Sequence, residues 1–252
     1  MTISRGNPQD WRALQRQVHQ ILGECGFESK IENRVQTVRG DVTIDVYARD
    51  PSSQPPIIYL CECKLWQSRV PQTVVHAFRT VVTDHGANWG FIISSAGFQR
   101  AAYRAAANSN VKLLTWNEFQ EIFTDRWVSR YMAPRLRSET ESLVEYIEPF
   151  NARVFRKADR LPESSQKRFA ELREKWASLG FLAQHLFVGI GFLGERPPQL
   201  PLRAPGQTQS TRYENLPEEV LDATCFRDFV GNICRIARRG IEEFDQLFGE
   251  RA

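Results

Sequence analysis

Two stretches, GDVTIDVYA at residues 40–48 and IIYLCECK at residues 57–64, decide the fold predicted for this chain. Their β-branched and aromatic residues are typical of neighbouring strands in a sheet. Because successive strand side chains point to opposite faces, Glu62 and Lys64 share a face at the end of the second stretch. If the two strands pair as neighbours, Asp45 stands beside them. Such charges at the edge of an apolar sheet are costly to bury unless they pair or hold a metal, which indicates a functional site.

Asp45, Glu62 and Lys64 have the chemistry of a metal-dependent hydrolase. Converging carboxylates and a backbone carbonyl are the hard oxygen ligands that suit Mg²⁺, an ion that bridges readily to phosphate. A neighbouring lysine can orient or help deprotonate a metal-bound water and offset charge on the attacked phosphate. The pattern therefore favours metal-assisted phosphodiester hydrolysis. For these three residues alone, the alternative is an ordinary surface Glu–Lys pair with an unrelated aspartate.

The surrounding periodicities predict an α/β fold. A strand at residues 31–38 precedes the two stretches, so the three strands form a meander. The remaining elements are a helix at 11–25 with Asn7 as its N-cap and Gly26 at its end, a helical stripe at 74–82 ending at Gly86, a strand at 89–93, an Ala-rich helix at 98–107 and a strand at 111–114. The order α-β-β-β-α-β-α-β implies a mixed central sheet flanked by helices.

A mainly α-helical region follows, and we place the domain boundary near Pro149. The helices expected after the sheet elements cover 118–131 (with Asn117 as N-cap), 139–147, 153–159, 164–179 and 225–248. Residues 195–217, rich in Pro, Gly, Gln and Thr, predict a long loop. We therefore expect a first domain at 1–149 and a mostly helical region at 150–252 that serves sensing, dimerisation or partner docking.

The composition is that of a globular protein with a small basic surplus. The 252 residues contain 33 Lys and Arg against 30 Asp and Glu, a formal net charge of +3. Residues 1–135 hold 16 basic and 12 acidic side chains, hence +4, whereas residues 136–252 hold 17 and 18, hence −1. The first half is therefore favoured as the part that binds a polyanion, although many proteins without nucleic-acid partners are as basic.

The cysteines and apolar runs place the chain in a reducing, cytoplasmic setting. The five cysteines show no zinc-binding spacing, so we expect them to be reduced and mostly buried. The longest apolar run, residues 179–194, contains Gln184 and His185 and is shorter than the ~20 apolar residues of a membrane helix. No membrane span and no secretory signal are predicted.

Several blocks in a fixed order resemble one nuclease family. Residues 40–46, the CECKLW block at 61–66, the stripe from Val74 to Phe78 and the GFIISSAGF block at 90–98 resemble the Mrr-like restriction endonuclease domain. The resemblance covers about residues 10–123. That domain belongs to the PD-(D/E)xK nuclease superfamily, so the resemblance implies a restriction-endonuclease-like core, α-β-β-β-α-β.

The resemblance also implies roles for the charged residues. Asp45, Glu62 and the backbone carbonyl of Cys63 would hold Mg²⁺, with Mn²⁺ as a substitute, and Lys64 would be the catalytic lysine. Gln15 stands where the first helix of family members often has a glutamate; it is an auxiliary residue that can hydrogen-bond a metal-bound water but leaves one carboxylate fewer. The implied activity is that of a Mg²⁺-dependent endonuclease cutting DNA in restriction or antiviral defence.

Candidate DNA contacts flank these elements, and each has an ordinary structural alternative. They are Arg39, Arg69, Ser94, Ser95 and Arg100. The two serines precede a helix, where hydroxyls and N–H groups hold a phosphate or simply cap the helix. The motif GIGFLG at 189–194 is followed by Glu-Arg-Pro-Pro, which cannot begin the helix that a nucleotide-binding glycine motif needs.

Two further possibilities stay open. The alternative function is a nuclease-fold module that binds DNA or a protein partner without cutting. Cleavage of both strands by one site needs sequential nicks or a second subunit, so a homodimer or a defence-system partner is expected. The apolar runs at 181–187 and 226–236 are candidates for that contact, with packing inside the chain as the alternative.

Overall fold

A computed structural model of the chain describes residues 1–203 and 215–249. The chain divides into two compact units, Gly6–Trp127, called here the sheet unit, and Met1–Arg5 together with the residues from Val128 onward, called the helical unit. This division lies between residues 127 and 128, not near Pro149, because the helix that follows Val128 packs on later helices. The domain boundary near Pro149, which separates the regions to which different functions are assigned, stays a prediction.

The sheet unit contains the predicted elements in the predicted order. They are α1 (Trp11–Glu24), β1 (Glu28–Thr37), β2 (Gly40–Asp50), β3 (Ile57–Lys64), α2 (Gln72–His85), β4 (Trp89–Ser94), α3 (Arg100–Ala106), β5 (Val111–Thr115) and α4 (Trp116–Trp127). The strands lie in the order β1-β2-β3-β4-β5. The first three pair antiparallel and the last three parallel, which confirms the meander and the mixed sheet.

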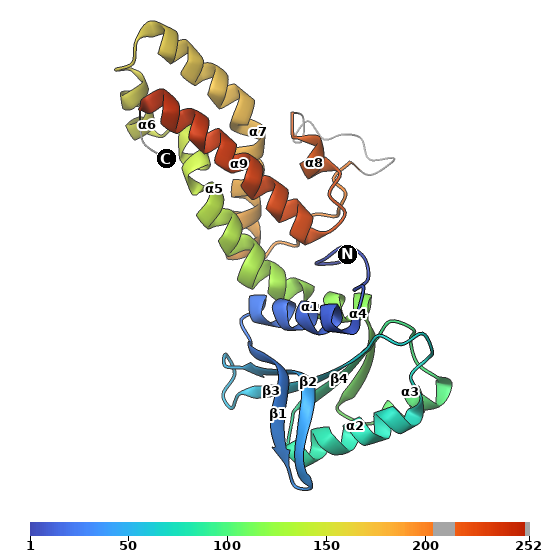
Figure 1. Cartoon of the computed structure of the whole chain (residues 1–252). Coiled ribbons are helices and arrows are strands. Elements are labelled where there is room, and N and C mark those ends of the chain that lie inside the picture. The colour runs from blue at the N-terminus through green and yellow to red at the C-terminus, as the bar shows by residue number, and fades with distance from the viewer. Residues whose placement is uncertain (204–214, 250–252) are drawn as a thin grey trace. The chain divides into compact units, whose positions relative to one another are not determined.

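Helices cover both faces of the sheet: α1 and α4 lie on one face and α2 and α3 on the other (Figure 1). On the α2 face, Leu60 and Ile92 of the central strands pack in one buried cluster with Val75 and Val82 of α2. The contact between α2 and β4 is close, because a Cβ on Gly90 would lie 2.6 Å from Val82 Cγ2. On the other face, aromatic side chains of β3 and β4 meet those of α4.

Two helix starts differ from the prediction. The N-cap of α1 is Asp10, whose Oδ1 accepts a hydrogen bond from the Ala13 N–H at 2.7 Å, so the predicted cap at Asn7 is wrong. The cap at Asn117 is also wrong, because α4 begins at Trp116, directly after β5. Gly86 follows α2 with φ of +76°, as expected of a left-handed helix end.

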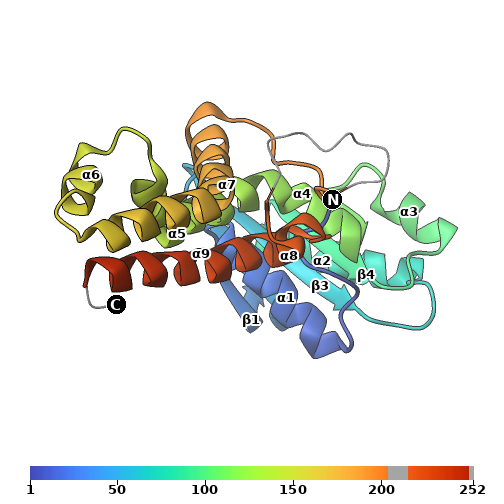
Figure 2. The same ribbon diagram turned by 90° about the horizontal axis from the view of Figure 1, so that it is seen from above.

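The helical unit consists, among the described residues, of π-helix η1 (Val128–Met132) and helices α5 (Ala133–Ile147), α6 (Ala152–Ala158), α7 (Glu163–Leu193), α8 (Glu218–Leu221) and α9 (Phe226–Phe248). This confirms the mainly helical C-terminal region. Helices α5, α7 and α9 pack side by side (Figures 1 and 2). The chain start joins this unit, because the N–H groups of Phe226 and Arg227 donate to the carbonyls of Thr2 and Ile3.

Helix α7 is longer than the sequence indicated. It continues from residue 179, where the predicted helix stopped, to Leu193, and therefore includes most of the GIGFLG motif in a helix rather than after a strand. A Cβ on Gly180 would lie 2.8 Å from Ile147 Cγ1, so a glycine is needed where α7 crosses α5. The described flanks of the predicted loop at 195–217 are irregular up to residue 203, and residues 204–214 lie outside the described part.

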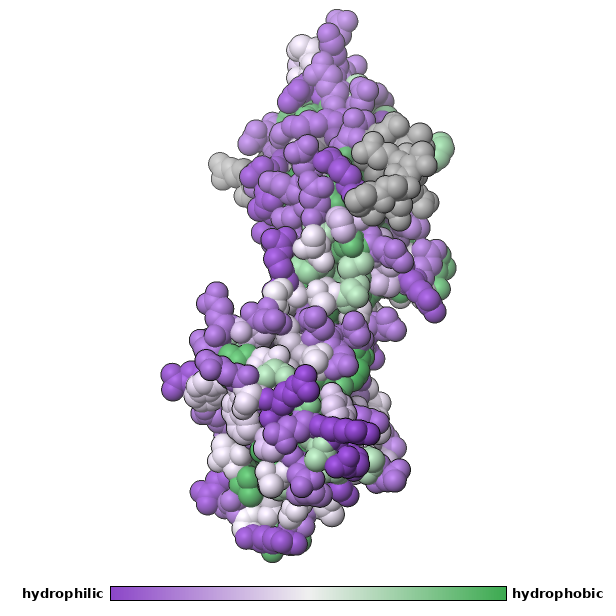
Figure 3. Space-filling view, turned by 90° about the vertical axis from the view of Figure 1, so that its right-hand side faces the viewer, coloured by the Kyte–Doolittle hydropathy of each residue, from purple (hydrophilic) through white to green (hydrophobic). Residues whose placement is uncertain are grey.

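One helix in the described part of the chain, α7, is long and apolar enough to cross a membrane by length and composition alone. Half of its most apolar 18-residue window is buried. On the face drawn in Figure 3, hydrophilic side chains predominate over the helical unit, with small hydrophobic areas between them.

All five cysteines are free and buried, as predicted. Burial raises the pKa of the Cys25 thiol to about 12, partly offset by the charge of Arg126, and it raises the pKa of Cys61 and Cys63 as well. Because the thiolate is the reactive form, these side chains behave as small apolar core residues.

Candidate active site

The candidate site lies where β2 and β3 separate. Their ladder of paired residues ends at Val46 and Cys61, although both strands continue past these residues. Beyond this point the Asp45 side chain takes the place of a strand partner: its Oδ2 accepts a hydrogen bond from the Cys63 N–H at 2.7 Å. The carboxylate is therefore fixed between the two strands by a bond that satisfies a backbone donor.

The regular alternation of β2 is interrupted at this position. Ile44 belongs to the core cluster on the α2 face with Leu60, whereas Val46 pairs with Cys61, whose side chain points to the other face. Regular alternation along the strand would place Ile44 and Val46 on one face, but the structure places them on opposite faces. On β1, Glu32 stands opposite Asp45 with φ of +49°, and this pair is missing from an otherwise continuous register. The interruption sets the Asp45 carboxylate into the opening between the strands.

Gln15 holds the second oxygen of this carboxylate. It is a buried residue of α1, and its Nε2 donates to Asp45 Oδ1 at 2.8 Å. The sequence-based placement of Gln15 beside the site agrees with this contact. Its neutral amide orients Asp45 without adding a charge, so Asp45 and Glu62 are the two carboxylates at this point.

Glu62 and Lys64 share one face at the end of β3, as the alternation predicted. Lys64 Nζ lies 2.5 Å from Glu62 Oε1, and the two side chains are 19% and 21% exposed. The ring of Trp66, which is partly open to solvent, has its centroid 5.5 Å from the ammonium. Burial, followed by the charge of Asp45, raises the pKa of Glu62, and the bond from Lys64 lowers it by less.

These residues fit a divalent cation. Burial is the main cause of the raised pKa of Glu62 and the negative charge of Asp45 is the second, so a bound cation would stabilise the two carboxylates in their charged forms. Within the described residues, no three His, Cys, Asp or Glu side chains converge as a metal-binding group. The predicted ligand set contains only two such carboxylates, so the Cys63 carbonyl and water must complete it. Hard oxygen ligands with several waters are the coordination that Mg²⁺ accepts.

Replacement of Glu62 by Gln tests the free-energy cost of the charged Glu62 side chain in the folded protein, and the test does not require nuclease activity. A raised folded-state pKa means that Glu62 favours folding below its unfolded pKa of about 4.3 and that this contribution is lost as pH rises through the folded pKa. Gln carries no charge to desolvate. We therefore expect the Glu62→Gln variant, in EDTA at pH 7, to be at least as stable to heat as the wild type, with the difference gone below about pH 4.

Thermal unfolding measured at both pH values checks this expectation. Added MgCl₂ should stabilise the wild type but not the variant, because only the wild type has both carboxylates. A variant that is clearly less stable than the wild type in EDTA at pH 7 would show that the Glu62–Lys64 pair is structural.

A basic rim lies beside the end of β3. The Ser95 N–H donates to the Lys64 carbonyl at 3.2 Å, and an isolated bridge joins Val70 to Phe98. This bridge brings together the loop that carries Arg69 and the start of α3, where Arg100 lies, and both arginines are exposed. In the described part of the chain, the structure shows no ion pair for either arginine. They are therefore available to phosphates near Lys64.

The other predicted DNA contacts already have hydrogen-bond or ion-pair partners within the chain. Ser94 is buried and donates to the Gly97 carbonyl at 3.1 Å, which leaves its hydroxyl away from the surface. Ser95 is exposed and donates to the Trp66 carbonyl. Arg39, in the β1–β2 turn, pairs with Asp84 at 2.9 Å. Of the five residues, Arg69 and Arg100 have the geometry that suits a phosphate contact best.

The sheet is mixed, five-stranded and flanked by helices, and Asp45 of β2 lies between β2 and β3 where they separate. Together with the Glu-x-Lys sequence at the end of β3, this arrangement defines a restriction-endonuclease-like core. Residues 7–123 match the family model described as a restriction endonuclease, which confirms the predicted resemblance of this segment to the Mrr-like restriction endonuclease domain. The matched residues cover nearly all of the sheet unit, including every residue of the candidate site.

Solved structures give weaker likenesses. A protein of unknown function, AF1548, is 17% identical, covers 96% of this chain and 100% of its own, and has a TM-score of 0.39. The MspJI restriction endonuclease in complex with a 27-mer oligonucleotide is 21% identical, covers 47% of this chain and has a TM-score of 0.32. The match spans 28% of the MspJI chain. None of the curated proteins compared with this chain matches it.

Proposed function

We propose that this protein is a Mg²⁺-dependent endodeoxyribonuclease that cuts DNA phosphodiester bonds in defence against foreign DNA. The observation that carries the proposal is the Asp45 carboxylate set between the separating strands, next to the Glu62–Lys64 pair. The restriction endonuclease family model over the same residues supports the reaction class. A cytoplasmic location is part of the proposal.

Each residue of the site has a distinct task in this proposal. Asp45, held by the Cys63 N–H and Gln15, and Glu62 are the anionic ligands, and the Cys63 carbonyl is the neutral one. Bound Mg²⁺ would polarise the scissile phosphate and lower the pKa of a water molecule. Lys64 is held by Glu62 at the rim, where its ammonium can donate to a phosphate oxygen or to the attacking water.

DNA is proposed as the substrate because Lys64 lies in the site and two exposed arginines lie on segments near the end of β3, while the carboxylates are partly buried. Arg69 lies in the loop after β3 and Arg100 at the start of α3, and the Val70–Phe98 bridge joins these two segments. A single site of this kind cuts one strand. Double-strand cleavage therefore requires sequential nicks or two chains, and a homodimer is the arrangement that identical chains adopt most often.

Cleavage of supercoiled plasmid tests the proposal. Purified protein should nick or linearise plasmid in MgCl₂ or MnCl₂ and should be inactive in EDTA. A labelled RNA of the same length as a DNA duplex, assayed side by side, distinguishes the two substrates. Metal-independent cutting, or no cutting of plain, methylated and hydroxymethylated DNA in either metal, would contradict the proposal.

A non-cleaving nuclease-fold module is the second candidate. One observation favours it: every polar group of the site already has a partner, since Lys64 pairs with Glu62 and Asp45 accepts two hydrogen bonds. The two candidates differ in metal affinity. Calorimetric titration with Mn²⁺ should show binding that Glu62→Gln abolishes if the site is catalytic, and no carboxylate-dependent binding if it is not.

The basic rim predicts a specific salt dependence. The logarithm of DNA affinity falls linearly with the logarithm of salt concentration, and each lost phosphate contact should make this slope less steep by about 0.9 for duplex DNA. We expect this change for Arg69→Ala and for Arg100→Ala, and about twice the change for the double variant. Fluorescence anisotropy with a labelled duplex in CaCl₂, over a range of salt concentrations, measures the slope. Arg156→Ala, an exposed arginine of α6, is the control and should leave it unchanged.

A further inference from the structure

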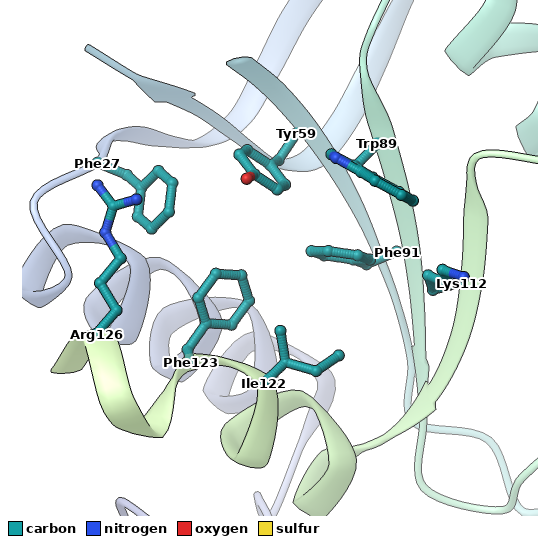
Figure 4. A pocket seen from close by; sticks show the side chains of 8 residues that line it. All are labelled: Phe27, Tyr59, Trp89, Phe91, Lys112, Ile122, Phe123 and Arg126. Carbon is teal, nitrogen blue, oxygen red and sulfur yellow. The ribbon is translucent and has the colours of Figure 1, made fainter. Parts of the chain in front are cut away.

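The sheet unit contains a second concave site, an aromatic pocket of about 350 Å³ between the sheet and α4 (Figure 4). Its wall is formed by Tyr59 of β3, Phe91 of β4 and Phe123 of α4, whose ring centroids lie 5.7 to 6.4 Å apart. Trp89 stands at its rim and is 36% exposed. A volume of this size accommodates a small organic ligand.

This pocket is separate from the candidate active site. Tyr59 precedes Lys64 by five residues, which corresponds to roughly 17 Å along a strand. The two side chains also point to opposite faces of the sheet, since Tyr59 packs against α4 while Glu62 and Lys64 alternate to the other face. A ligand in the pocket therefore does not touch the residues proposed to cut DNA.

Two cations lie at the ends of the pocket, and only one of them lacks a counter-charge (Figure 4). Arg126 is neutralised by Asp50, whose two carboxylate oxygens it contacts. Lys112, from β5, lies 5.7 Å from the centroid of the Trp89 ring, and the described part of the chain shows no ion pair for it. The pocket lining contains no acidic side chain. Its ligand should therefore be planar and aromatic, with one anionic group near Lys112.

We propose that this pocket binds a mononucleotide unit, with the base against the rings of Trp89 and Phe91 and the phosphate on Lys112. Aromatic rings bind bases of any sequence by stacking, and a lysine is a suitable point charge for a phosphate. Tyr59 lines the pocket and supplies a polar contact, because a phenol, whose ordinary pKa is about 10, is a hydrogen-bond donor at neutral pH. The unit can be a free nucleotide or the unstacked nucleotide of a nucleic-acid strand.

Calorimetric titration of the full chain in EDTA tests the proposal independently of cleavage. The probes are AMP, GMP, CMP and UMP, with adenosine and ribose 5-phosphate as compounds that lack the phosphate or the base. We expect a nucleoside monophosphate to bind, and Lys112→Ala to weaken that binding at least about tenfold while leaving adenosine unaffected. Lys167→Ala, an exposed lysine of α7, is the matched control and should change nothing.

A second variant fills the pocket. Ile122, on α4, lines it and is 51% exposed, so Ile122→Trp should block the cavity without loss of fold, which thermal unfolding verifies. A labelled single-stranded oligonucleotide is titrated in parallel. If Lys112→Ala and Ile122→Trp weaken oligonucleotide binding while free nucleotides do not bind, the unit belongs to a strand. The proposal would be overturned if neither the free nucleotides nor the oligonucleotide binds, or if neither variant changes the binding that is observed.

Discussion

Replacement of Lys64 by Ala should reduce plasmid cleavage roughly 100- to 1,000-fold, the effect of removing one preorganised group that stabilises charge in a transition state. The fold should persist, because the ammonium is at the rim of the site and 19% exposed. The rate of loss of supercoiled plasmid, measured with enzyme in excess over DNA, gives the effect. Lys167→Ala, far from the site in sequence and exposed on α7, should cut at the wild-type rate.

Asp45→Ala should also abolish cleavage, but its interpretation is less direct. It removes the acceptor of the Cys63 N–H and of Gln15 Nε2, so it leaves two buried donors without a partner and lowers stability as well. Lys64→Ala therefore separates chemistry from folding better. If the Lys64→Ala protein cuts as fast as the wild type, the nuclease activity comes from another site or from a contaminant.

The order of elements could be predicted because each has a strong local signal. Period-two alternation and β-branched residues mark the three strands of the meander, and apolar residues three and four apart mark α2. The helix starts were less certain. Asn7 and Asp10 both suit an N-cap, and only the backbone path decides which carbonyl begins the helix.

The structure brings the predicted site residues together, but the alternation argument that grouped them was only partly correct. Strict alternation places Asp45 on the face of Glu62, yet the structure sets its carboxylate between the strands after an interruption opposite Glu32. No residue of the sequence around Asp45 announces that interruption, because the strand has neither a glycine nor a proline there. Gln15 could be singled out only through the family resemblance, because nothing in its own helix indicates a contact with Asp45.

Features that depend on contacts between distant residues could not be predicted. The aromatic pocket joins side chains from three strands, a loop and α4. Met1–Arg5 pack with the helical unit although the next residues belong to the sheet unit, because the first residues of α9 donate to their carbonyls. The Asp50–Arg126 pair joins residues 76 positions apart. Such pairs leave no periodic signal in the sequence.

That pair predicts the largest stability effect in the sheet unit. Arg126 Nη2 lies 2.9 Å from Asp50 Oδ1, Arg126 Nη1 contacts Oδ2, and the Asp50 side chain is only 5% exposed. Arg126 Nε also donates to the Cys25 carbonyl, so one guanidinium ties α4 to the end of β2 and to the end of α1. Asp50→Asn would leave this cation without its counter-charge and should cost about 3–5 kcal/mol of unfolding free energy.

The pH dependence gives a second test of the same pair. The hydrogen bond from Arg126 holds the pKa of Asp50 well below its usual range, despite burial. Its contribution is therefore complete above the unfolded pKa of about 3.9 and is lost as pH falls toward the lowered folded value. The gap between wild type and Asp50→Asn should narrow as pH falls below about 4, because Asp50 of the unfolded wild-type chain binds a proton while Asp50 of the folded chain stays ionised.

Hydrogen exchange of peptides from β2 and β3 reports the sheet unit alone, so the helical unit does not confuse the measurement. Asp125→Asn, an exposed aspartate of α4, is the control and should change stability by less than about 0.5 kcal/mol. Arg126→Met added to Asp50→Asn should recover part of the loss, because an apolar pair leaves no buried charge. If Asp50→Asn and Asp125→Asn exchange alike at pH 7, the Asp50–Arg126 pair contributes nothing, and packing of α4 on the sheet alone holds these elements together.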